Sequence, residues 1–201
     1  MNKSFAFATL AFAATAASAA TAAQAPAARA QAVFAGGCFW CTEADFDKIS
    51  GVISTTSGYT GGKLANPTYK QVSAGGTGHI EAVRVVYDPA KVSYATLANR
   101  FFRTIDPLDG GGQFCDRGYQ YRSAIFVANP EQQRNATASK ARAANQLKGK
   151  GTVATLILPA AKFYPAEAYH QDYYKKNPVR YRFYRLRCGR DARLNKVWGN
   201  G

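Results

Sequence analysis

The sequence predicts an α+β or α/β domain, in which helices pack on a mixed sheet. Segments with the alternation of strands are separated by segments with the spacing of helices, an order typical of these architectures. Hydrophobic residues make up 47% of the 201 residues, which is enough for one sizeable core and not clearly for two. No internal repeat and no interdomain linker follows residue 31. We therefore expect a single domain over residues 31–201, ending in a basic tail.

The first predicted elements are a strand at residues 30–36 and a helix at residues 42–50. The strand runs into two consecutive glycines. Thr42, Glu43 and Asp45 open the helical segment, where an N-capping side chain and negative charges suit the positive end of the helix dipole. This order predicts a strand, a tight turn and a helix.

The next segments predict two strands with a short helix between them. Residues 51–62 read as a strand that ends in a glycine-rich loop, and residues 66–75 as a helix with Pro67 near its start. Residues 79–89 alternate apolar and polar side chains imperfectly, and Pro89 helps to end this strand.

A second helix is predicted at residues 93–106. Ser93 precedes the segment, and Leu97, Phe101 and Ile105 recur four residues apart, so they lie on one helix face. The later elements are a glycine-rich loop at 109–122, a strand at 123–129, a helix at 130–149 and a strand at 152–159. We expect the remainder of the chain to be irregular.

The N-terminal segment has a different composition from the rest of the chain. Lys3 precedes an apolar run over residues 5–14, and small-residue triplets follow at 17–19 and 23–25. This layout is typical of a secretory signal peptide. The alternative is a membrane anchor, but the run is shorter than the ~20 residues that a span needs. We expect residues 1–30 to be removed and the protein to be exported to the periplasm, without stable membrane insertion.

The net charge of +14 is concentrated near the C-terminal end. Between residues 175 and 196 there are nine lysines or arginines and one acid, interleaved with aromatic residues. Such a mixture occurs in modules that bind nucleic acid or another acidic surface. No nucleic-acid fold motif accompanies it, so we favour a solvated basic flank and expect no nucleic-acid partner.

The stretch GGCFWC at residues 36–41 contains the first candidate for chemistry. Cys38 follows two glycines and precedes a predicted helix, and a helix N-terminus lowers the pKa of a cysteine. Phe39 and Trp40 would form an apolar pocket beside the sulfur. The ordinary alternative is a buried, unreactive core cysteine. The strand-turn-helix context favours a nucleophile.

Cys41 allows a second interpretation of the same stretch. A C-x-x-C pair at a helix start suits dithiol exchange, so a general thiol–disulfide oxidoreductase is the main alternative function. A zinc site would need several distant residues to converge, and a single C-x-x-C is weak support for one. The residues concerned are Cys38, Cys41, Cys115, Cys188, His79 and His170. We expect no metal and no cofactor.

Other polar residues complete a candidate site. Glu81 lies in an apolar strand, where burial would raise its pKa and make it a proton donor. Asp116 and Tyr121 lie in a loop before a strand, and Tyr69 lies on or near a helix. Each has an ordinary structural explanation when taken singly. Together with Cys38 they predict a site made of a cysteine, acids and tyrosines.

Six segments in matching order resemble the A class of peptide methionine sulfoxide reductases. They are GGCFWCTEADF, GYTGG, NPTY, GHIEAVRVVYDP, GYQYRSAIF and AYHQDYY, and the resemblance extends from about residue 33 to residue 177. It implies a two-layer α/β sandwich, an α+β fold with a ferredoxin-like core, a mixed sheet and extensive coil. It also implies thiol-dependent reduction of protein-bound methionine S-sulfoxide to methionine in the repair of oxidised proteins, and it leaves open whether free methionine sulfoxide is a second substrate.

The resemblance also implies roles for the candidate residues. Cys38 matches the nucleophile that attacks the sulfoxide sulfur, and Glu81 matches the acid that protonates its oxygen. Phe39 and Trp40 match the aromatic wall around the substrate methyl group. The groups that hold the oxygen are matched by Tyr69, Tyr121 and Asp116. Cys38 then becomes a sulfenic acid, which a second cysteine resolves to a disulfide and a thioredoxin-like reductant recycles.

This chain departs from the family in its other cysteines. Many members have glycine in place of Cys41, and many have two resolving cysteines in a C-terminal tail, where this chain has only Cys188. We expect Cys188 to resolve the sulfenic acid because a flexible tail would reach the site, with Cys41 second and Cys115 third. We expect a monomer.

Overall fold

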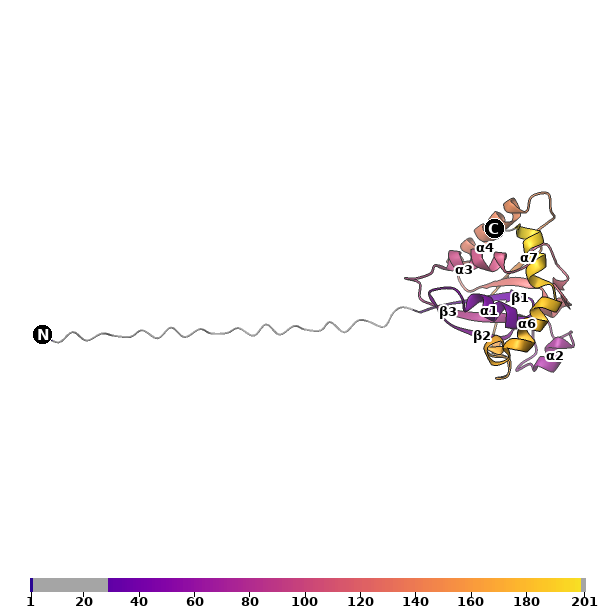
Figure 1. Cartoon of the computed structure of the whole chain (residues 1–201), viewed down its shortest axis with the longest axis horizontal. Coiled ribbons are helices and arrows are strands. Elements are labelled where there is room, and N and C mark those ends of the chain that lie inside the picture. Colours follow the sequence, from indigo (N-terminus) through magenta and orange to yellow (C-terminus); the bar gives the residue numbers. More distant parts are fainter. Residues whose placement is uncertain (2–28, 200–201) are drawn as a thin grey trace.

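The computed structural model describes Met1 and residues 29–199, and these residues form a sheet with helices packed against it (Figure 1). The predicted signal peptide lies almost wholly outside the described residues. Six strands form the main sheet in the order β7-β6-β1-β3-β2-β8. Their bounds are β1 Ala30–Gly36, β2 Val52–Thr60, β3 Ile80–Tyr87, β6 Ser123–Val127, β7 Leu156–Pro159 and β8 Tyr164–Pro165.

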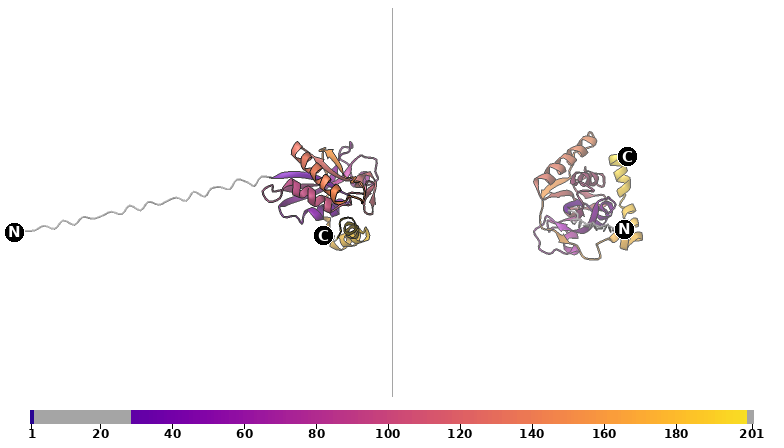
Figure 2. Two further views of the ribbon diagram at one scale, coloured as in Figure 1. Left: turned by 90° about the horizontal axis from the view of Figure 1, so that it is seen from above. Right: turned by 90° about the vertical axis from the view of Figure 1, so that its left-hand side faces the viewer.

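Seven α-helices are found in the described part of the chain. They are α1 Phe39–Phe46, α2 Tyr69–Ser73, α3 Tyr94–Arg103, α4 Pro130–Gln146, α5 Tyr173–Lys176, α6 Pro178–Arg187 and α7 Arg190–Trp198. The glycine-rich loop before β6 contains the two-residue strands β4 Gly112–Gln113 and β5 Asp116–Arg117, and a 3₁₀ turn at Tyr119–Tyr121. Figure 2 shows the C-terminal helices along one side of the domain.

The connectivity confirms the predicted α+β class with a ferredoxin-like core. Strand β1 leads through α1 to β2, β2 returns beside β3, and β3 leads through α3 to β6. The pairs β1–β3, β1–β6, β2–β3 and β2–β8 are antiparallel, whereas β6 and β7 are parallel. The sheet is therefore mixed, as predicted.

The two faces of the sheet have different coverings because successive side chains of a strand point to opposite faces. Phe34 of β1 and Val83 and Val85 of β3 belong to the main hydrophobic core, which also contains side chains of α1, α3 and α4. Ala35 and Ala82 belong to a smaller cluster on the other face, together with residues of β6 and β7. Glu81 shares the strand parity of Val83, so it faces the helical layer.

Helix α1 differs from its predicted bounds, because it begins at Phe39 rather than at Thr42. Cys38 occupies the N-cap position, and the Cys38 carbonyl accepts hydrogen bonds from the backbone N–H of Thr42 (3.2 Å) and from its hydroxyl (3.3 Å). The prediction that acids open this helix was wrong, since its first turn contains none. The earlier start brings the helix N-terminus directly onto Cys38.

The prediction of an irregular C-terminal region was also wrong. Helices α6 and α7 cover most of residues 178–198. Pro178 stands at the first position of α6, where its fixed φ suits a helix, and this signal was available in the sequence. Contacts with α1 further stabilise α6. Arg185 pairs with Asp45 (3.1 Å), and Tyr181 packs in a cluster with Cys41.

The strand predicted at residues 152–159 is limited to Leu156–Pro159, and the helix predicted at 66–75 to Tyr69–Ser73. Thr68 caps that helix, in a reciprocal capping box with Gln71. Among residues 29–199, no helix combines the length and the apolar character that crossing a membrane requires.

Candidate active site

The sulfur of Cys38 lies at the junction of β1 and α1. Gly37, between them, has a φ of +80°, and a Cβ at this position would lie 2.5 Å from the Cβ of Gln113, so only glycine fits. The turn places Cys38 at the N-cap of α1, where the side chain is 6% exposed. The nucleophile predicted from the sequence is therefore at a helix N-terminus, and it is buried.

Glu81 lies directly beside this helix N-terminus. Its carboxylate oxygen accepts a hydrogen bond from the backbone N–H of Phe39 (3.1 Å), and the residue is 2% exposed. Burial raises the pKa of Glu81 to about 8, and the negative charge of Asp116 contributes. The side chain is thus protonated at neutral pH, a state in which it is able to donate a proton.

Cys41 is the immediate partner of Cys38. Both thiols are free and buried, and they lie three residues apart at the start of α1. The neighbouring Cys38 thiol, together with the charges of Arg190 and Arg185, lowers the pKa of Cys41 to about 7. Burial raises the pKa of Cys38, which is opposite to the lowering expected from the helix N-terminus alone. The pair therefore loses its first proton near neutral pH and supplies one thiolate there.

Asp116 joins the site from the loop before β6, as predicted. It accepts a hydrogen bond from the hydroxyl of Tyr184, a residue of α6 that the sequence did not single out. Burial raises the pKa of both groups, and the Tyr184 hydroxyl also interacts with the Cys38 sulfur. Tyr184 therefore connects the carboxyl group to the nucleophile.

Tyr69 and Tyr121 lie close together in the structure although their numbers differ by 52. Each phenol influences the pKa of the other, and the charges of Glu81, Cys38 and Asp116 act on both. Burial raises the pKa of Tyr69 to about 12, and that of Tyr121 is raised for the same reason. Both phenols stay protonated and are able to donate hydrogen bonds to a polar oxygen near Cys38.

The two aromatic residues after Cys38 have different surroundings. Phe39 is 1% exposed and packs among Tyr59, Tyr69 and His170, with ring centroids 4.9 to 6.3 Å away. Trp40 is half-buried and stacks on Tyr173, with ring centroids 3.8 Å apart. Trp40 is the better placed of the two to contact a bound ligand.

The segment AYHQDYY supplies further residues of the site. His170 is 1% exposed, and its Nδ1 accepts a hydrogen bond from Trp40 Nε1 (3.0 Å). Burial lowers the pKa of His170, so the ring is neutral and suited to accept this bond. Glu167, just before the segment, accepts from the Tyr59 hydroxyl (2.9 Å) and the Tyr69 backbone (2.8 Å). The density of aromatic residues is the sequence signal that marks this segment.

Cys115 and Cys188 form a disulfide, with Cα atoms 4.9 Å apart. Cys188 caps the C-terminal end of α6 and Cys115 precedes Asp116. The first-ranked resolving cysteine is therefore neither free nor in a flexible tail in this structure. A carboxylate oxygen of Asp116 lies within 4.8 Å of both sulfurs, but a disulfide provides no thiolate for a metal.

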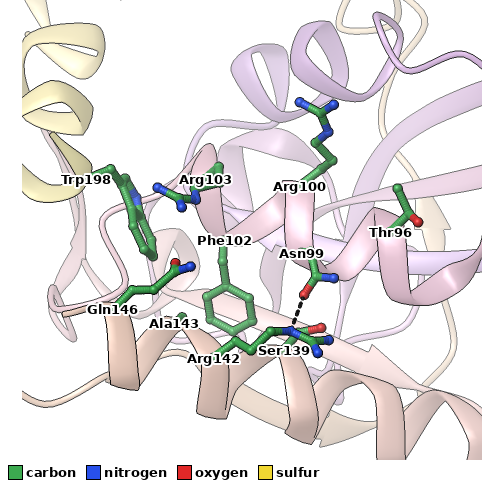
Figure 3. Close-up of a pocket in the computed structure, with 10 residues that line it drawn as sticks. All are labelled: Thr96, Asn99, Arg100, Phe102, Arg103, Ser139, Arg142, Ala143, Gln146 and Trp198. Carbon is green, nitrogen blue, oxygen red and sulfur yellow. Dashed lines mark hydrogen bonds between the residues drawn. The ribbon is translucent and has the colours of Figure 1, made fainter. Parts of the chain in front are cut away.

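A separate groove lies between α3 and α4, with Trp198 at one end (Figure 3). Its volume is about 360 Å³, and its lining includes Arg100, Arg103 and Arg142. None of the predicted site residues lines this groove. The chemistry inferred from the sequence therefore belongs to the small buried site around Cys38.

The arrangement around Cys38 suits reduction of a polar S=O group. A thiol pair supplies two electrons, a protonated carboxyl supplies a proton, and two phenols supply hydrogen bonds to an oxygen. Low solvent exposure strengthens each of these interactions.

Known proteins agree with this chemistry. A family model described as peptide methionine sulfoxide reductase matches residues 30–201. The peptide methionine sulfoxide reductase MsrA 2 of Caulobacter vibrioides is 57% identical over 168 residues, which cover 84% of this chain and 85% of that protein. Methionine sulfoxide reductase A of Corynebacterium diphtheriae is 38% identical with a TM-score of 0.70, over 75% and 76% of the two chains. Reduced Mxr1 of Saccharomyces cerevisiae is 32% identical with a TM-score of 0.71, over 80% and 92%. The chain belongs to the peptide methionine sulfoxide reductase family.

Proposed function

We propose that the chain reduces methionine S-sulfoxide to methionine, in oxidised proteins and as the free amino acid, through the thiol of Cys38. The observation that carries this proposal is the protonated Glu81 held 3.1 Å from the Phe39 backbone N–H, at the helix N-terminus that Cys38 caps. A sulfoxide oxygen leaves poorly unless it gains a proton, so an acid must lie beside the attacking sulfur.

In the first step the Cys38 sulfur attacks the sulfoxide sulfur, and Glu81 gives its proton to the oxygen. The Cys41 thiolate is the acceptor for the Cys38 proton, because its pKa is about 7 and it is the neighbouring free thiol. Tyr69 and Tyr121 donate hydrogen bonds to the oxygen, while Trp40 packs against the substrate methyl group. Oxygen transfer to Cys38 leaves methionine and a Cys38 sulfenic acid.

In the second step a thiol attacks the sulfenic sulfur and water leaves, which forms a disulfide. We propose Cys41 for this attack, ahead of the Cys188 that the sequence favoured. Cys41 is free and already beside Cys38, whereas Cys188 is bonded to Cys115. An N-cap residue and the third helical residue have Cα atoms about 5 to 6 Å apart, within the range of disulfides.

Recycling requires a dithiol reductant, because each turnover converts two thiols into a disulfide. We propose a thioredoxin-like protein, which exchanges thiolate for disulfide and leaves oxidised. The second pair, Cys115 and Cys188, is a further acceptor for its electrons, since Cys115 is exposed where Cys38 is not. Tyr184 and Asp116 link this pair to the catalytic site.

The cellular setting is part of the proposal. The composition of residues 1–30 favours export to the periplasm, and we propose an exported monomer. N-terminal sequencing of the protein from its native host would test removal of the segment, and light scattering would test the monomer. An intact N-terminus would contradict export.

The decisive experiment measures reduction of a methionine-sulfoxide peptide, as separated S and R epimers, with dithiothreitol as reductant. We expect turnover of the S epimer only, and loss of turnover in Cys38→Ser. The competing function, general disulfide reduction through Cys38 and Cys41, predicts instead that the chain reduces insulin and that Glu81→Gln retains this activity.

A further inference from the structure

The outer face of α6 exposes large apolar side chains. Val179 is 78% exposed, Phe183 64% and Leu186 79%. Their spacing of four and three residues puts them on one face of the helix, so they form a continuous stripe. The opposite face packs into the protein through Tyr181 and Tyr184. We call Val179, Phe183 and Leu186 the α6 stripe.

Guanidinium groups flank the α6 stripe. Arg180, Arg182 and Arg187 are exposed, and within residues 29–199 none of the three forms an ion pair. The guanidinium of Arg187 lies 5.9 Å from the ring centroid of Phe183. Arg185 points the other way and pairs with Asp45 and Asp191. The outer face is therefore apolar along its centre and positively charged at its edges.

The helix that carries the α6 stripe ends at the Cys115–Cys188 disulfide. Cys188 caps the same helix and is bonded to Cys115, which is exposed to solvent. The inner face of the helix carries Tyr184, which contacts Asp116 and Cys38. A partner seated on the α6 stripe is thus within one helix length, about 15 Å, of an accessible disulfide.

We propose that the α6 stripe and its flanking arginines are the docking surface for the protein dithiol reductant, an inference that rests on the proposed function. The partner has an apolar surface around its reactive thiol and acidic residues at the edge of that surface. Its thiolate attacks a sulfur of the Cys115–Cys188 disulfide to form a mixed disulfide, and its second thiol then displaces the chain. The partner leaves as a disulfide, and Cys115 and Cys188 are left as two thiols. These thiols then reduce the Cys38–Cys41 disulfide by a second exchange, which restores the Cys115–Cys188 disulfide and frees the catalytic pair.

An anionic membrane is the other surface that suits a basic amphipathic helix. The position of the α6 stripe favours the reductant, because the C-terminal end of α6 carries the Cys115–Cys188 disulfide, which only a thiol reduces by exchange. The apolar part also consists of only three side chains on a ten-residue helix. The membrane is therefore treated as an outcome of the test.

The test compares two reductants on the double variant Phe183→Ser/Leu186→Ser. An acidic thioredoxin and dithiothreitol each drive reduction of a methionine-S-sulfoxide peptide by the same enzyme. We expect the KM for thioredoxin to rise about tenfold or more. Phe183 and Leu186 would be buried in the complex, and loss of two apolar side chains at the centre of an interface weakens binding by at least that factor. The rate with dithiothreitol should stay unchanged. Ile53→Ser, which alters another exposed apolar residue, is the control.

Charge reversal supplies a second measurement. Arg180→Glu/Arg187→Glu should raise the KM for thioredoxin and weaken its dependence on salt, whereas Arg134→Glu on α4 should not. An unchanged thioredoxin KM in both double variants would overturn the proposal. Loss of co-sedimentation with anionic phosphatidylglycerol vesicles at unchanged KM would overturn it in favour of a membrane. Absence of any dithiothreitol-driven turnover in the wild type would instead contradict the proposed function.

Discussion

The hydroxyl of Tyr184 donates a hydrogen bond to the carboxylate of Asp116, although 68 residues separate them in the sequence. The bond joins α6 to the loop before β6, and the Cys115–Cys188 disulfide fastens the same two segments close by. Trp40 packs edge-on against the Tyr184 ring, with centroids 5.6 Å apart. The C-terminal helices thus form one wall of the catalytic site.

Replacing Tyr184 with Phe should lower kcat about tenfold. The ring would still pack on Trp40, but Asp116 would lose a hydrogen bond, and bonds to charged groups contribute about 1.5 to 3 kcal/mol. The measurement is dithiothreitol-driven turnover of the S epimer, with Tyr119→Phe as the control because Tyr119 is exposed. If Asp116 and Tyr184 act together, the double variant Tyr184→Phe/Asp116→Asn will be no slower than the worse single variant.

Replacing Glu81 with Gln should lower turnover by about 100-fold or more, the contribution of a positioned general acid. Because the pKa of Glu81 is about 8, the wild-type rate should also fall as the pH rises through that value. The measurement is a pH–rate profile from pH 6 to 10, with Glu131→Gln on α4 as the control. Wild-type-like turnover in Glu81→Gln would remove this residue from the mechanism.

Stability should decline as the pH rises from 4.5, the ordinary pKa of a glutamate, to about 8. The native pKa values of Glu81 and Glu43 are raised by burial to about 8 and about 7, so the native state holds protons that the unfolded state has released. Their contribution is complete below the unfolded pKa and is lost as the pH rises through the native values. Urea unfolding at pH 5, 7 and 9 would show a flatter pH dependence in Glu81→Gln and Glu43→Gln. If the free energy of unfolding of both variants depended on pH as that of the wild type does, Glu81 and Glu43 would not hold protons in the native state.

Replacing Cys41 with Ser should stop the cycle after one turnover. The Cys38 sulfenic acid would lose its resolving thiol, so a single equivalent of methionine would form and a dimedone adduct would accumulate on Cys38. Peptide mapping of the oxidised wild type should find a Cys38–Cys41 disulfide. A Cys38–Cys188 disulfide in that map would support the order favoured by the sequence. The Cys188→Ser variant should still form the Cys38–Cys41 disulfide.

Removing the Cys115–Cys188 disulfide should destabilise the fold by about 4 kcal/mol, the loop-entropy value for a closed loop of this length. The two cysteines are 73 residues apart, and they tie α6 to the loop before β6. Urea unfolding of Cys115→Ser/Cys188→Ser against the oxidised wild type measures this difference. An unchanged midpoint would show that the other contacts of α6 hold it without the disulfide.

The sequence predicted the core of the fold because its signals are local. The alternation in β3 and the four-residue spacing in α3 each depend on neighbours along the chain, and both elements are present. Ser93 caps α3 as its sequence position indicates. The helices α6 and α7 were missed although Pro178 and the spacing of Val179, Phe183 and Leu186 are helical signals. The α6 stripe faces solvent, so its spacing did not indicate a helix that packs on the core.

The sequence by itself determined the residue types of the site: a cysteine at a strand-turn-helix junction, an acid within an apolar strand, one tyrosine on or near a helix and another in a loop. Only the tertiary structure decided how they act. The raised pKa of Glu81 and of Cys38 comes from burial by distant segments, and the pairing of Cys115 with Cys188 joins residues far apart in the chain. Burial and long-range pairing arise when the whole chain packs, so no local pattern contains them.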